Sequence, residues 1–73
     1  MSEQEQMKLS MVKKLALMLM ENDPSLSMEQ ALSIVLNSDT YQKLQNEATQ
    51  LYYQSPRYVY SFLENELRTG VMR

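Results

Sequence analysis

Residues 7–25, MKLSMVKKLALMLMENDPS, decide the fold of this chain, because they join a broad apolar helical face to an abrupt stop. At about 100° per residue, the apolar side chains here sweep an arc of roughly 220°, about twice what a helix packed on one side needs. Asp23 and Pro24 end the helix, since the residue before a proline avoids the helical region and proline lacks an amide hydrogen. Ser2, three residues before a Glu, begins a capping box. The sequence therefore predicts a helix over residues 3–22.

This wide apolar face has two interpretations. Its members are Met7, Leu9, Met11, Val12, Leu15, Ala16, Met18, Leu19 and Met20. Either the helix is central and the rest of the chain covers it, or a second protein chain covers part of it. Leu17 lies on the otherwise polar side, where an internal core does not need it, and flexible thioethers suit adaptable surfaces. We expect a homodimer packed through this helix, with Met11, Leu17 and Met18 near the seam.

The next two helices also have recognisable starts. Ser27, followed three residues later by a Gln, forms a second capping box and predicts a helix over residues 28–36. A polar break follows, in which Ser38 or Asp39 can cap a third helix. Apolar positions at helical spacing place that helix at residues 40–53.

The end of the third helix and the bounds of the fourth rest on different signals. The sequence leaves undecided whether the third helix is interrupted around residues 46–50. Ser55 at the N-cap and Pro56 at the first helical position are a strong helix start, because both use amides that have no helical partner. Arg68 in the last turn and Gly70 beyond it indicate the end. Alternation long enough for a strand is not found.

Length and composition limit both fold and function. With 73 residues, of which 44% are hydrophobic, residues 1–73 have room for one all-α domain, a small bundle of four helices with short polar connections. The chain has no Cys and no His, which removes zinc clusters, thiol nucleophiles and imidazole bases. Its single Gly removes Gly-rich phosphate loops. We therefore expect no enzymatic activity, no metal and no cofactor.

Charge and hydropathy narrow the set of partners. A formal net charge of −2 lacks the electrostatic footprint of a phosphate-backbone binder, so nucleic acid is an unfavoured partner. The longest apolar run, residues 15–20, is far shorter than the roughly 20 residues that cross a bilayer. No cationic segment with an unbroken apolar run opens the sequence, so we expect a cytoplasmic protein with no membrane partner.

Two residues are candidates for special roles. Adjacent Tyr52 and Tyr53 cannot point the same way on a helix, so at least one reaches the surface or its edge, either as an interface contact or with its hydroxyl in water. Tyr53 is the best candidate for an exposed contact. Glu66 falls inside the apolar arc of the fourth helix and, if buried there, needs donors. The start of the third helix, with Ser38, Thr40 and the Tyr41 hydroxyl, can supply them. If the fourth helix frays early, Glu66 instead turns into water.

About the last half of the chain contains the pattern Asn37-Ser38-x-Thr40-Tyr41-x-x-Leu44, then Thr49-x-Leu51-Tyr52, then Ser55-Pro56-x-Tyr58-x-Tyr60-x-x-Leu63-x-x-Glu66. This pattern resembles a family of small uncharacterised bacterial helical proteins that have no assigned activity. The resemblance implies that the cap from Ser38 to Tyr41 and Glu66 belong to a shared structural pattern. Some small helical proteins of this kind look like products of mobile-element or toxin–antitoxin neighbourhoods.

The function predicted from the sequence is a small non-catalytic interaction module, most simply one that binds a copy of itself or another protein. The alternative is a helix-turn-helix-like DNA-binding protein or an accessory regulator of a toxin–antitoxin pair. Amide side chains on the third helix can read adenine edges, which favours the alternative. Lys43 is the only cation between Lys14 and Arg57, which disfavours it.

Overall fold

The computed structural model describes residues 2–69, and within them every regular element is helical. The elements in chain order are α1 (Glu3–Asn22), α2 (Met28–Leu36), α3 (Asp39–Gln45), the 3₁₀ turns η1 (Glu47–Thr49) and η2 (Leu51–Tyr53), and α4 (Pro56–Thr69). The predicted all-α fold of four helices is thus confirmed. The bounds of α1 and α2 are those predicted from their caps, whereas the stop signal at Gly70 lies outside the described residues.

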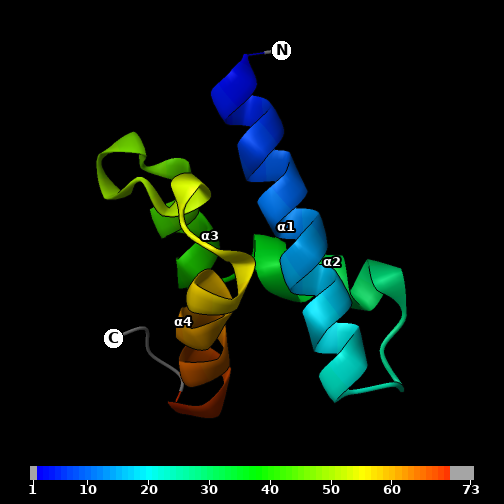
Figure 1. The fold of residues 1–73 in the computed structure, drawn as a ribbon. Helices are drawn as coiled ribbons and strands as arrows, with labels where there is room; N and C mark the ends of the chain where they lie inside the picture. The colour runs from blue at the N-terminus through cyan, green and yellow to red at the C-terminus, as the bar shows by residue number, and fades with distance from the viewer. Residues whose placement is uncertain (1, 70–73) are drawn as a thin grey trace.

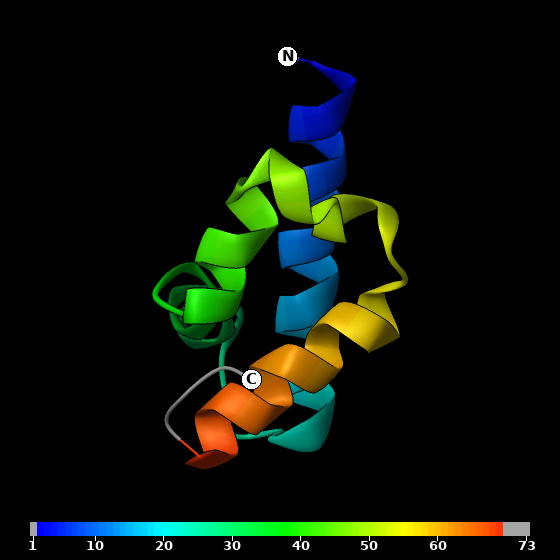
Figure 2. The same cartoon turned by 90° about the vertical axis from the view of Figure 1, so that its left-hand side faces the viewer.

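Helix α1 is the centre of the fold. In Figure 1, α2 crosses behind α1 while α3 and α4 lie on its left, and the rotated view of Figure 2 shows α3 and α4 in front of it. Contacts join α1 to all three other α-helices and to η2. The buried apolar core comprises Met11, Val12, Leu15, Ala16, Leu19, Ala31, Val35, Leu44, Leu51, Tyr52, Val59, Tyr60 and Leu63. The broad apolar arc of α1 is therefore used largely inside its own chain.

Local caps explain where the first two helices begin and end. The Ser2 hydroxyl accepts a hydrogen bond from the Glu5 amide at 3.1 Å. At the start of α2, Ser27 accepts from the Gln30 amide at 3.2 Å, and the Gln30 side chain accepts from the Ser27 amide at 2.9 Å. Helix α1 stops at Asp23, whose amide donates to the carbonyl of Leu19 at 2.8 Å. Amides that have no helical partner are thus satisfied by residues a few positions away.

The interruption that the sequence leaves open around residues 46–50 is present, and the helix that begins at Asp39 ends before it. Helix α3 ends at Gln45, because the Asn46 side chain accepts from the Ala48 amide at 3.0 Å and opens a new turn. Gln50 then has φ 53° and ψ 28°, a left-handed conformation that no other non-glycine residue among those described adopts. The break allows η2 to turn back against α1, where Tyr52 joins the core.

Candidate functional site

The first turn of α3 is held by a carboxylate from α4. The Asp39 amide donates to Glu66 Oε2 at 2.7 Å, and the Thr40 amide donates to Glu66 Oε1 at 2.9 Å. The Thr40 hydroxyl donates to the same Oε1 at 2.8 Å. Ser38 Oγ accepts from the next amide, that of Tyr41, at 3.0 Å. Each of the first three amides of α3 therefore has an oxygen acceptor, and Glu66 places a negative charge at the positive end of the helix.

The structure brings Glu66, Ser38 and Thr40 together, with two differences from the sequence-based prediction. Glu66 is half-buried rather than buried, because it lies near the edge of the interface between α3 and α4. Tyr41 contributes its amide to Ser38, while the donors to Glu66 are two amides and the Thr40 hydroxyl. Thr40 itself is fully buried, so this cluster is a structural contact and exposes little chemistry to solvent.

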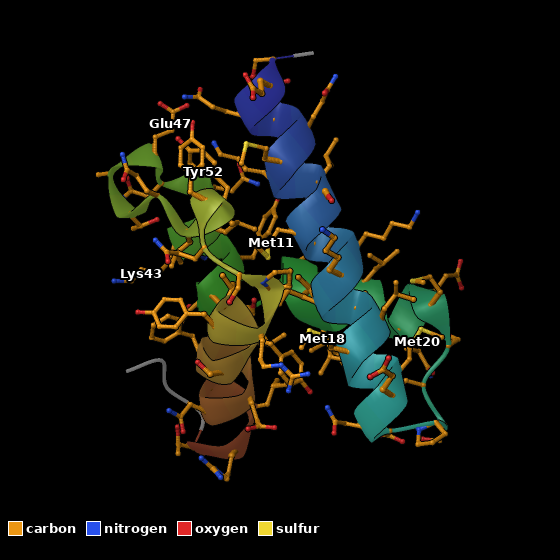
Figure 3. All side chains as sticks on the ribbon, in the orientation of Figure 1. Met11, Met18, Met20, Lys43, Glu47 and Tyr52 are labelled. Atoms are coloured by element: carbon orange, nitrogen blue, oxygen red, sulfur yellow. The ribbon has the colours of Figure 1, made fainter. Side chains whose placement is uncertain are left out.

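The other end of α3 is held by Lys8 of α1, a residue that the sequence analysis missed. Lys8 Nζ donates to the carbonyl of Gln45, the last residue of α3, at 3.3 Å. It also lies 3.8 Å from Glu47 Oε1 and 5.6 Å from the ring centroid of Tyr52. Figure 3 shows Tyr52 and Glu47 together on the η1–η2 side of α1. The sequence did contain a signal, since Lys8 lies two turns before Leu15, within the apolar face of α1.

The predicted interface residues of α1 have unlike surroundings. Met11 is only 4% exposed and packs in the core of its own chain, so the prediction that it lies at a seam is wrong. The reason is that η2 folds back against α1 and covers this part of the helix. Leu17 is 43% exposed and Met18 is half-buried. In Figure 3 Met18 lies on the α4 side of α1, whereas Met20 lies on the α2 side.

Tyr53 is 59% exposed, while its neighbour Tyr52 is buried, and the ring centroids of the two lie 4.6 Å apart. Burial raises the pKa of the Tyr52 hydroxyl, and the charge of Tyr53 adds to this shift. Burial also raises the pKa of the Tyr60 hydroxyl, although the hydrogen bond from Asn22 Nδ2, at 2.8 Å, lowers it in part. These hydroxyls stay protonated at neutral pH and act as polar edges of the core.

Two shallow hollows follow each other along one side of α1. The upper hollow is lined by Met7, Ser10, Met11 and Lys14 of α1 and by Tyr52, Tyr53, Gln54 and Pro56. The lower hollow is lined by Met18, Glu21 and Asn22 of α1 and by Arg57, Tyr60, Ser61 and Glu64 of α4. At about 270 and 300 Å³ they are at or below the lower end of small-molecule sites, so they fit the side chains of a macromolecular partner better.

The exposed side of α3 is polar. Asp39, Gln42, Lys43 and Asn46 line an open hollow there, and Figure 3 shows Lys43 pointing away from the body of the protein. The short connection at residues 37–38 separates α2 from α3, as in a helix-turn-helix. Asp39 sits beside Lys43, however, so this face offers a phosphate group no net positive charge.

The chain matches no known family model, and no curated protein or solved structure is significantly similar to it. The resemblance to small bacterial helical proteins therefore stays a prediction. Across residues 2–69, three or more acidic side chains never gather in a group that could hold a metal ion. In the same region, each helix is too short or too polar to span a bilayer.

Proposed function

We propose that this protein is a non-catalytic interaction module that pairs with a second copy of itself through the outer side of α1. The observation that supports the proposal is the position of Leu17 and Met18. Leu17 is 43% exposed on the helix that forms the centre of the core, and half-buried Met18 follows it at the edge of the α4 groove. Met18 lines the lower hollow, which is mainly polar, and the upper hollow carries the apolar side chains of Met7 and Met11 toward Tyr53.

The energetics favour association over isolation. A domain of this size buries only about 60% of its unfolded surface, and its core provides a net stability of about 3–5 kcal/mol. Burial of exposed leucine, methionine and tyrosine against a copy adds apolar contact that the monomer cannot make. The described residues expose 4870 Å², so a standard interface of about 800 Å² per partner covers roughly a sixth of that surface. A seam on one helix is at the small end of this range, so we expect weak pairing that depends on protein concentration.

The test is the oligomeric state as a function of concentration. Sedimentation equilibrium from about 5 to 500 µM should show a monomer–dimer equilibrium for the natural chain. Leu17→Glu should shift the equilibrium fully to the monomer, because a charge at the seam cannot be buried without a partner. Leu9→Glu is the matched control, since Leu9 is also an exposed leucine of α1, at 56%, and points about 80° away from Leu17. A natural chain that stays monomeric at 500 µM overturns the proposal, as does an intact dimer in Leu17→Glu.

DNA binding is the alternative function. The helix-turn-helix-like connection of α2 and α3 and the amides on α3 support it, whereas the negative charge of Asp39 in the same hollow as Lys43 opposes it. Fluorescence anisotropy with mixed-sequence duplex at low salt distinguishes the two functions. We expect no binding at 50 mM salt, and salt-sensitive binding that Lys43→Ala removes would favour the alternative.

A further inference from the structure

We propose that the two copies pair through antiparallel α1 helices, with a two-fold axis between Leu17 and Met18 that sets Lys14 of each copy opposite Glu21 of the other. This inference rests on the proposed self-association and adds its geometry. It assigns a second copy of this chain, rather than another protein, to the α1 surface.

Lys14 and Glu21 lie on one side of α1. They are seven residues apart, which is two turns less about 20°, so their side chains leave the helix in nearly the same direction. Leu17 lies between them in sequence and about 40–60° to one side, with Met18 about 40–60° to the other. The exposed surface of α1 therefore has an apolar centre with a cation one turn before it and an anion one turn after it.

Only one direction of pairing makes these charges complementary. In an antiparallel pair with its axis between residues 17 and 18, residue 14 meets residue 21 of the copy, and both ion pairs form at once. In a parallel pair, Lys14 faces Lys14 and Glu21 faces Glu21, which costs energy at both positions. Exposed ion pairs contribute little affinity, so their main effect is to choose the orientation while Leu17 and Met18 supply the apolar contact.

The two hollows have the same complementarity. The upper hollow contains one cation, Lys14, and the lower hollow contains Glu21, Glu64 and Arg57, which leave one net negative charge. An antiparallel arrangement sets the Lys14 end of the upper hollow of each copy against the Glu21 end of the lower hollow of the other. Tyr53 at the rim of the upper hollow then reaches toward the turn after α1 of the copy. The ends of the two hollows that meet thus carry opposite charges, as a self-complementary interface requires.

Introduced cysteines test the orientation, because the natural chain has none and every disulfide must come from the substitution. In the proposed pair, two copies of residue 17 are offset along the axis by about 1.5 Å, and two copies of residue 10, an exposed serine outside the ion pairs, by about 22.5 Å. A disulfide needs Cα atoms about 4.4–6.8 Å apart. After copper-catalysed air oxidation, Leu17→Cys should form at least tenfold more covalent dimer than Ser10→Cys. A parallel pair would cross-link at both positions.

Charge exchange is the second arm, read by sedimentation equilibrium. Lys14→Glu should weaken the dimer about tenfold, since two like-charged contacts replace two ion pairs, and Lys14→Glu with Glu21→Lys should return it to within threefold of the natural chain. Lys13→Glu, an exposed neighbour that points about 100° away from Lys14, is the control and should change the constant less than threefold. If the natural chain dimerises through Leu17 but Ser10→Cys cross-links as much as Leu17→Cys, or the double exchange fails to restore binding, the antiparallel geometry is wrong and self-association stands. If the natural chain is a monomer, both proposals fail.

Discussion

Replacement of Glu66 by Gln is the sharpest perturbation of this fold. The carboxylate receives three hydrogen bonds at 2.7, 2.8 and 2.9 Å, two of them from amides in the first turn of α3. In Glu66→Gln, the remaining carbonyl can keep the two contacts to Thr40, but the new amide group then points a donor at the donor of Asp39. The substitution also removes the negative charge from the positive end of the helix.

The size of the effect follows from these contacts. A hydrogen bond to a charged group contributes about 1.5–3 kcal/mol, and a charge at a helix terminus about 0.3–1 kcal/mol. Because Glu66 is half-buried and the Asp39 contact is exposed, water replaces part of what is lost. The expected destabilisation is about 2 kcal/mol, a large share of the roughly 3–5 kcal/mol that a domain of this size has. With a urea m value of about 1 kcal/mol/M, the unfolding midpoint falls by about 2 M.

Urea unfolding at pH 7, followed by far-UV circular dichroism, measures this effect. Glu64→Gln is the matched control, because Glu64 is an exposed carboxylate on the same helix, and its midpoint should move by less than 0.5 M. Thr40→Val removes the hydroxyl from a fully buried site and should cost about 1 kcal/mol. The double variant should cost less than the sum of the two single variants, since in Glu66→Gln the Thr40 hydroxyl donates to a neutral carbonyl, and losing that contact costs less than losing one to a carboxylate. A midpoint for Glu66→Gln within 0.5 M of the natural chain refutes the assignment of Glu66 as the cap of α3.

Three further outcomes follow from single residues. Gln50→Gly should raise stability by about 0.5–1 kcal/mol in the same urea assay, because glycine adopts a φ of 53° without a Cβ clash, and a loss of stability would contradict this. Lys8→Met should lower the stability by about 1 kcal/mol, because the ammonium group that contacts the end of α3 and the Tyr52 ring is lost while the aliphatic part of the side chain still packs. An unchanged midpoint would show that only the aliphatic part contributes. Burial raises the folded pKa of Tyr60 above its unfolded value of about 10, so the stability it contributes is present below pH 10 and is lost as the pH rises through the folded pKa. The fall in stability from pH 9 to 11 should therefore be smaller in Tyr60→Phe than in the natural chain, and equal falls in the two would count against this reasoning.

The sequence predicts those elements whose ends are fixed by neighbours in the chain. Helices α1 and α2 have the predicted bounds because Ser2, Pro24 and Ser27 act on amides within a few residues of themselves. The sequence does not decide where α3 ends, because apolar residues continue at helical spacing beyond its last residue. The break depends on the competition of Asn46 for a backbone amide and on the left-handed Gln50, which periodicity cannot detect.

Tertiary contacts explain the remaining differences. The prediction that Met11 lies near a dimer seam is wrong because the sequence does not reveal that η2 folds back and covers this residue. The place of Glu66 inside the apolar arc of α4 predicts its contact with another helix. Lys8 lies inside the apolar arc of α1 in the same way, so the same signal identifies it. Gln45, which accepts the hydrogen bond from Lys8, lies 37 residues further along the chain. Only the structure identifies such a partner. In this protein, a charged residue inside an apolar helical arc therefore indicates contact with the end of a helix that is far away in the sequence.

The two charged caps also connect stability to the proposed interface. Helix α3 has seven residues, far fewer than the roughly 12–15 that form a marginally stable helix alone, so it depends on contacts at both ends. Those contacts are Lys8 on α1 and Glu66 on α4, which means that α3 can form only when α1 and α4 are both in place. The same α1 and α4 helices form the walls of the lower hollow. By contacting both α1 and α4, α3 helps to hold the groove beside Met18 in one shape, so in the proposed dimer little affinity would be lost to ordering this surface.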